Sequence, residues 1–135
     1  NNPKIRKSSS NIPSWSLQFL EPDMYIFKEK FSLFLDAKYK SHFYNLSSRS
    51  DFLTEEHRLD LHQISAYCAF NNSDNNNGLL VYPANSYKFF PLKYNNSING
   101  AALNIYLIGV PISSQNIRII ENQLLHDFKT LLYNR

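Results

Sequence analysis

Aromatic and branched residues are concentrated in two runs near the start of the chain, separated by a short charged segment. Residues 15–27 are rich in these side chains and predict one or two strands, and residues 31–39 predict another. Only Lys28, Glu29 and Lys30 separate the two runs. Because so short a connection cannot cross over a sheet, we expect the flanking strands to pair antiparallel in a hairpin.

Two later segments have the pattern of helices. Residues 54–70 contain no Gly or Pro, Thr54 is a suitable N-cap, and Glu55 and Glu56 suit the first turn. Apolar residues recur at helical spacing in the last part of the chain. They are Ile117, Ile120, Leu124, Leu125, Phe128, Leu131 and Leu132.

The segments between these helices predict loops and further strands. Residues 41–51 and 71–78 are polar and predict loops. Residues 79–82 and 87–90 predict short strands, and the apolar run 101–110 predicts a buried strand. The order of strand, strand, helix, strands and helix is typical of an α/β fold.

Length and composition restrict the class of protein. A chain of 135 residues with 43% hydrophobic and 19% charged residues is typical of one globular domain and argues against disorder. The longest apolar run, near residues 105–110, is far too short to span a membrane. A single cysteine, Cys68, cannot form an internal disulfide and fits a reducing, cytoplasmic compartment.

The start of the chain differs from the rest in composition. Residues 1–13 are polar and basic and predict a linker or extended arm, with the folded domain over residues 14–135. The first residue is Asn1 and the only Met, Met24, falls in an expected strand, which predicts that the chain is a piece of a longer polypeptide. A net charge of +3 permits a polyanionic partner but does not require one.

The expected hairpin brings together residues that carry chemistry. A two-residue turn places Lys28 opposite Phe31, and the same register then places Asp23 opposite Asp36. Opposed residues project to the same face, and so do residues two apart on one strand. We therefore expect Asp23, Asp36 and Lys38 to converge.

Two opposed carboxylates repel each other, and a hard divalent cation such as Mg²⁺ relieves that repulsion. Lys38 beside them is placed to orient or deprotonate an attacking water, or to stabilise phosphorane charge. The alternative is a surface hairpin in which Asp36 and Lys38 form an ordinary ion pair. The opposite face of the hairpin is also apolar, which favours a covered and functional site over that alternative.

The order of these residues resembles a known family. Pro22-Asp23, then Leu35-Asp36-Ala37-Lys38, then Gln63 and Tyr67 on the following helix, resemble the PD-(D/E)xK nucleases of the RecB-like branch. The segments 35–40 and 60–67 look more narrowly like the McrC and LlaJI-type nuclease subunits of restriction systems. The resemblance implies a restriction-endonuclease-like core, with a mixed central sheet flanked by helices.

The same resemblance implies a function. It predicts a Mg²⁺-dependent DNA endonuclease, with Mn²⁺ as a substitute, that hydrolyses phosphodiester bonds under the control of a McrB-like AAA+ GTPase subunit. Asp23 and Asp36 would hold the metal, Lys38 would assist catalysis, and Gln63 and Tyr67 would hold the DNA backbone or brace the catalytic groups. Only three glycines are present and none forms a Gly-rich phosphate loop, so GTP use would belong to the partner.

Helical spacing supports this extension to the helix. Glu56, Asp60, Gln63 and Tyr67 are separated by four, three and four residues and form one polar stripe that can face the metal site. Members of the family usually have a further acidic residue before the first strand, but residues 1–20 contain no Asp or Glu. Glu21, expected on the strand face of Asp23, is the candidate substitute.

Two other functions remain open at this point. One is a RecB-like DNA repair nuclease, and the other is an inactive nuclease-like module that only binds DNA. Zinc chemistry is not expected, because His42, His57, His62 and His126 lack the clustering of a zinc site and only one Cys is present. The target sequence, any dependence on methylation, and the oligomeric state have no signal in the sequence.

Overall fold

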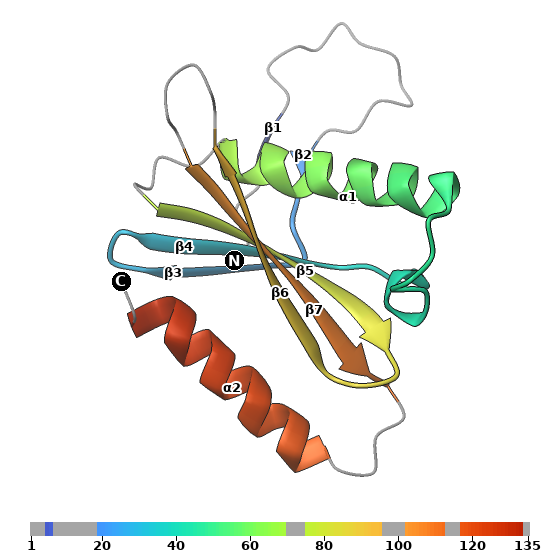
Figure 1. The fold of residues 1–135 in the computed structure, drawn as a ribbon. Helices are drawn as coiled ribbons and strands as arrows, with labels where there is room; N and C mark the ends of the chain where they lie inside the picture. The colour runs from blue at the N-terminus through green and yellow to red at the C-terminus, as the bar shows by residue number, and fades with distance from the viewer. Residues whose placement is uncertain (1–4, 7–18, 70–74, 96–101, 113–116, 134–135) are drawn as a thin grey trace, which may run out of the picture.

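A five-stranded mixed sheet with one helix on each face forms the body of the protein (Figure 1). The computed structural model describes residues 5–6, 19–69, 75–95, 102–112 and 117–133. The sheet strands are β3 (Met24–Lys28), β4 (Phe31–Ala37), β5 (Asn75–Ala84), β6 (Lys88–Asn95) and β7 (Ala102–Pro111). The helices are α1 (Asp51–Ala69) and α2 (Ile117–Tyr133), with a short 3₁₀ helix, η1 (His42–Tyr44), before α1.

The strand order β3-β4-β5-β7-β6 follows from the connections. β3 and β4 form an antiparallel hairpin, whereas β4 and β5 are parallel and are joined through α1. β5 also pairs parallel with β7, and β6 pairs antiparallel with β7 at the far edge. A parallel pair requires a crossover connection, which is the role of α1. The α/β class with a mixed central sheet and flanking helices is therefore confirmed.

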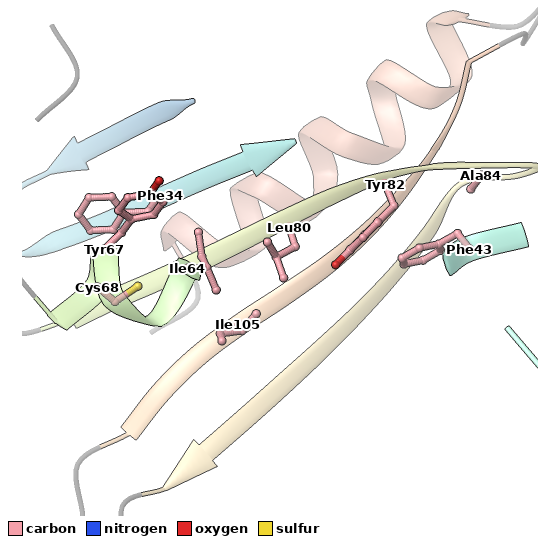
Figure 2. Packing of buried hydrophobic residues seen from close by; sticks show 9 residues of the cluster. All are labelled: Phe34, Phe43, Ile64, Tyr67, Cys68, Leu80, Tyr82, Ala84 and Ile105. Carbon is pink, nitrogen blue, oxygen red and sulfur yellow. The ribbon is translucent and has the colours of Figure 1, made fainter. Parts of the chain in front are cut away.

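Each face of the sheet has its own hydrophobic core. The cluster beneath α1 is shown in Figure 2 and comprises Phe34, Phe43, Ile64, Tyr67, Cys68, Leu80, Tyr82, Ala84 and Ile105. The cluster beneath α2 comprises Phe31, Leu33, Leu79, Tyr106, Ile108 and Leu131. Alternate residues of β4 and β5 enter opposite clusters, as the period of a strand requires. The expectation that the hairpin is covered on both faces is confirmed for β4, whereas β3 at the edge of the sheet is largely exposed, including Met24 and Phe27.

Two glycines allow elements to approach the sheet closely. A Cβ added at Gly78 would lie 2.6 Å from Cγ1 of Ile64 on α1. A Cβ added at Gly109 would lie 2.6 Å from Cδ1 of Phe43 on η1. Both distances are far below van der Waals contact, so the absence of a side chain lets α1 and η1 pack directly on the strands.

The hairpin has the predicted turn and register. Glu29 and Lys30 form a two-residue turn, and the pairs run from Lys28 opposite Phe31 to Met24 opposite Leu35. Glu29 has a φ of 54°. A positive φ at the first central position is typical of the turns that match the twist of a hairpin.

Two boundary predictions are wrong. Thr54 is not the N-cap, because α1 begins at Asp51 and the Thr54 hydroxyl donates to the carbonyl of Ser50 within the first turn. Residues 75–78 are not loop but the first part of β5. Asn77 is fully buried there, and its side-chain amide donates to the Ser32 carbonyl at 3.0 Å. Parallel pairing with β4 thus overrides the turn preference of asparagine.

The start of the described chain contributes a separate strand pair. β1 (Ile5–Arg6) pairs antiparallel with β2 (Phe19–Leu20) in a two-stranded sheet. Most of the expected linker at residues 1–13 lies outside the described residues. Within the described part, neither helix is long and apolar enough to cross a membrane.

Candidate functional site

The candidate site lies where β4 ends beneath α1. Asp36 is on the α1 side of β4 and is 5% exposed. Lys38 follows the strand, and its backbone N–H donates to the Val81 carbonyl at 2.7 Å, which continues the pairing of β4 with β5 past the strand end. This continuation fixes the backbone that presents Lys38. Its ammonium contacts the Asp36 carboxylate and donates to Oε1 of Gln63 at 2.6 Å.

Asp23 reaches the same place from the neighbouring strand. It directly precedes β3, whose last pair with β4 joins Met24 and Leu35. Oδ2 of Asp23 accepts a hydrogen bond of 2.8 Å from the backbone N–H of Ala37, which lies between Asp36 and Lys38. The structure therefore brings Asp23, Asp36 and Lys38 together, as the hairpin register predicts.

The environment of Asp36 disfavours its ionised form. Burial raises the pKa of the Asp36 carboxyl, the Lys38 ammonium opposes that rise, and the charge of Asp23 adds to it. Oδ2 of Asp36 is buried and is contacted by the Lys38 ammonium. A cation that binds this oxygen must therefore compete with Lys38 for it.

The helix α1 braces this arrangement from above. Gln63 connects two groups, since its Oε1 accepts from Lys38 and its Nε2 donates to the Tyr67 hydroxyl at 3.2 Å. The Tyr67 hydroxyl in turn donates to the backbone carbonyl of Glu21 at 3.0 Å. Tyr67 is 5% exposed and its ring stacks on Phe34. The resemblance gives Gln63 and Tyr67 two alternative roles, holding the DNA backbone or bracing the catalytic groups. These contacts favour the bracing role.

Glu21 takes part through its backbone. Glu21 lies in the segment between β2 and β3, outside both strands, and is exposed to solvent. The contact that links it to the site is the carbonyl that accepts from Tyr67. Its proposed role as an extra acidic ligand stays a prediction.

A second carboxylate network borders the site and includes Glu56 and Asp60 of the predicted polar stripe. Asp60 on α1 is 2% exposed. Its Oδ2 accepts from the Tyr82 hydroxyl at 2.8 Å, and its Oδ1 accepts from the Lys40 ammonium at 2.6 Å. Lys40 also pairs with Glu56 at 3.1 Å, and Lys38 lies 3.9 Å from Asp60. The spacing of the polar stripe placed Asp60 on the correct helix face, but only the fold shows that Tyr82 and Lys40 hold it.

The donor set suits some metals better than others. Among the residues that the structure describes, no group of three or more His, Cys, Asp or Glu side chains is arranged to hold a metal ion. Two carboxylates, Asp23 and Asp36, are nevertheless the usual protein share of a Mg²⁺ site, which takes its other ligands from water and substrate phosphate. They are too few and too hard for zinc, which prefers four nitrogen or sulfur ligands in structural sites. The residues present therefore fit Mg²⁺ or Mn²⁺.

Comparison with known proteins yields no assignment. No protein-family model matches the chain, and no curated protein matches it. The geometry of the site and the resemblance of its motifs are therefore the grounds for inferring function.

Proposed function

We propose that this chain is the Mg²⁺-dependent DNA endonuclease domain of a McrBC-like restriction system, built on a PD-(D/E)xK core. The observation that carries the proposal is the convergence of Asp23, Asp36 and Lys38 at one end of the β3–β4 hairpin. Burial of the Asp36 carboxylate beside the Lys38 ammonium adds support. An ordinary surface ion pair would have no reason to bury the Asp36 carboxylate, which belongs to a residue that is 5% exposed.

The order of elements supports the finer fold. In the proposed core, the hairpin that carries the acidic residues and the lysine is followed by a helix and a parallel strand. β3, β4, α1 and β5 follow in that order, and α1 returns the chain so that β5 lies beside β4. Because of this crossover, Gln63 on α1 lies within hydrogen-bond distance of the Lys38 ammonium.

The residues divide the chemical work between them. Asp23 and Asp36 would hold the Mg²⁺, which when bound supplies a Lewis acid that activates water and stabilises charge on the phosphorane. Lys38, a compact ammonium with several donors, orients the attacking water or neutralises the developing charge. Gln63 fixes the position of that ammonium through its 2.6 Å hydrogen bond.

By resemblance, the partners are DNA and a McrB-like AAA+ GTPase subunit that commands cleavage, in the cytoplasm. A RecB-like repair nuclease would use the same chemistry on DNA ends or flaps. It would differ in carrying its own helicase or end-binding domain. An inactive DNA-binding module would not need the Asp36 carboxylate to be buried beside Lys38.

The test measures DNA affinity and nicking of supercoiled plasmid on the same preparation, in Mg²⁺ and in Mn²⁺, with the McrB-like subunit of the same system added. Lys38→Ala should reduce nicking by about two orders of magnitude or more, because it removes a group that acts in the transition state. DNA affinity should change by no more than roughly threefold, since one phosphate contact at most is lost.

The matched control is Lys93→Ala, which removes the same charge from β6 at the opposite edge of the sheet, where the residue is exposed. It should cut like the wild type. If Lys38→Ala and Asp36→Ala both nick DNA at wild-type rates, the assignment fails. If both lose affinity in proportion to nicking, the chain is a DNA-binding module.

A further inference from the structure

We propose that Asp60 is a positioning residue that receives the Lys38 ammonium when a divalent cation occupies the Asp36 carboxylate. The inference rests on the proposed metal-dependent function and names how the site changes between its metal-free and metal-bound states. Asp60 would act through Lys38 and would not itself bind the metal.

The starting observation is that Lys38 stands between two carboxylates. Its ammonium contacts Asp36 and lies 3.9 Å from Oδ1 of Asp60. A shift of about 1 Å converts the longer separation into a hydrogen bond. Gln63 accepts from the same ammonium at 2.6 Å and can serve as its pivot during that shift.

Asp60 is held in place to act as the second acceptor. Its side chain is 3% exposed, and the Tyr82 hydroxyl from β5 donates to Oδ2 at 2.8 Å. Oδ1, the oxygen nearer to Lys38, also accepts from Lys40. A carboxylate held by Tyr82 of β5 and by Lys40 of the segment after β4 cannot withdraw from Lys38 when the site reorganises.

Competition for Asp36 makes a second acceptor necessary. A cation on Asp36 displaces the ammonium that now contacts it, and the Lys38 side chain is only 13% exposed, so water cannot fully solvate the displaced charge. Without Asp60, metal binding would leave a buried and unpaired ammonium. With Asp60, the ammonium keeps an ionic partner and stays beside the reacting groups.

The charge balance of the site agrees with this exchange. The two aspartates of the hairpin, Asp60 and Glu56 supply four carboxylates, while Lys38 and Lys40 supply two ammonium groups. When all are ionised, the excess of two negative charges equals the charge of one divalent cation. A bound Mg²⁺ therefore completes the network without requiring either lysine to leave.

The experiment is calorimetric titration of this chain with Mg²⁺ in the absence of DNA, so that metal affinity is measured apart from activity. Asp60→Asn keeps the size of the side chain and an acceptor for Tyr82 but removes the charge that receives Lys38. It should raise the Mg²⁺ dissociation constant by about tenfold. Glu56→Gln removes the same charge one turn away, where the carboxylate pairs with Lys40, and should raise it by less than about threefold.

A second background isolates the contribution of Lys38. In Lys38→Met no ammonium competes for Asp36, so adding Asp60→Asn should weaken Mg²⁺ binding no more than adding Glu56→Gln does.

If Asp60→Asn does not fold, a measurement on the wild type alone still tests the exchange. The ¹⁵N resonance of the Lys38 ammonium should move on Mg²⁺ addition and remain protected from exchange with water, because Asp60 and Gln63 still hold it.

The outcomes separate the two proposals. No Mg²⁺ or Mn²⁺ binding to the wild type overturns both the metal-dependent function and the exchange. A second result is that the wild type binds Mg²⁺ while Asp60→Asn leaves the dissociation constant unchanged, or raises it no more than Glu56→Gln does. That result overturns the exchange alone. So does a loss that persists in the Lys38→Met background, or a Lys38 ammonium resonance that broadens through water exchange when metal is added.

Discussion

Tyr67 shows how one side chain can belong to the core and to the site. Its ring packs against Phe34 in the cluster beneath α1, while its hydroxyl joins Gln63 to the carbonyl of Glu21. The sequence predicts Tyr67 in a polar stripe that faces the metal site, and burial of its ring shows that it also belongs to the core. A buried tyrosine must satisfy its hydroxyl, and here that requirement ties α1 to the segment that leads into β3.

Cys68, one residue further along α1, has a purely structural environment. It is 3% exposed, and burial raises the pKa of its thiol to about 12. We predict that an alkylating reagent at pH 8 leaves Cys68 unmodified in the native protein and modifies it within minutes in denaturant, because only the thiolate reacts. Mass spectrometry of the two samples is the measurement. Rapid modification without denaturant would contradict the packing of α1 on the sheet.

The raised thiol pKa also sets a direction for stability at high pH. The folded thiol ionises at about 12 and the unfolded one near 9.0, so the unfolded chain loses its proton first as the pH rises. The contribution of Cys68 to stability is therefore intact below pH 9.0 and is lost progressively between pH 9.0 and about 12. Burial raises the pKa of Tyr82 in the same direction, so Cys68→Ala should reduce the alkaline loss without abolishing it.

The β3–β4 hairpin is the element on which the site depends, and its turn contains the only non-glycine residue with a positive φ among the described residues. Glu29 has a φ of 54°, a conformation that costs about 1 kcal/mol or more for a residue with a Cβ. The turn nevertheless fixes the register that places Asp23 near Asp36. A one-residue slip would send these side chains to opposite faces of the sheet.

We predict that Glu29→Gly raises the free energy of unfolding by about 0.5–1 kcal/mol, because glycine adopts a positive φ without steric cost. The control is Lys30→Gly in the same turn, whose φ is not positive. That substitution adds freedom to the unfolded chain without relieving strain, so it should lower stability by roughly 0.5–1 kcal/mol. Urea unfolding of both variants is the test, and effects of the same sign would refute the turn geometry.

The elements differ in how far local sequence determines them. The hairpin register was predictable because a two-residue turn fixes every later pair. The second helix follows from apolar spacing, and the first from a run without Gly or Pro that begins with acidic residues. The first part of β5 was not predictable from the sequence, because Asn75, Asn76 and Asn77 favour turns. They form a strand only through pairing with β4. The Asp60 network was not predictable either, since its partner Tyr82 lies 22 positions away and meets it only after the crossover.

At the scale of the whole molecule, the site forms where three separate parts of the chain meet. No local sequence pattern links these three parts to one another. The hairpin supplies the acidic residues and Lys38, α1 covers them with Gln63 and Asp60, and β5 supports Asp60 through Tyr82. The parallel pairing of β4 with β5 therefore connects assembly of the sheet to assembly of the site. Loss of that pairing would remove both core packing and the geometry of the candidate site.

This dependence predicts that metal binding stabilises the entire fold. In the proposed site, Mg²⁺ would relieve the repulsion between Asp23 and Asp36 only in the folded chain, where the two carboxylates are close, so it would bind the native state in preference to the unfolded one. At a concentration about ten times the dissociation constant, the melting temperature should rise by roughly 3–5 °C. Thermal scans in Mg²⁺, Mn²⁺ and chelator, at constant ionic strength, measure the shift. Asp36→Asn should abolish it, whereas Asp51→Asn, which removes an exposed carboxylate from the first turn of α1, should preserve it. A wild-type midpoint that is the same with metal and with chelator, or a shift that survives in Asp36→Asn, would show that the two hairpin carboxylates do not form a metal site.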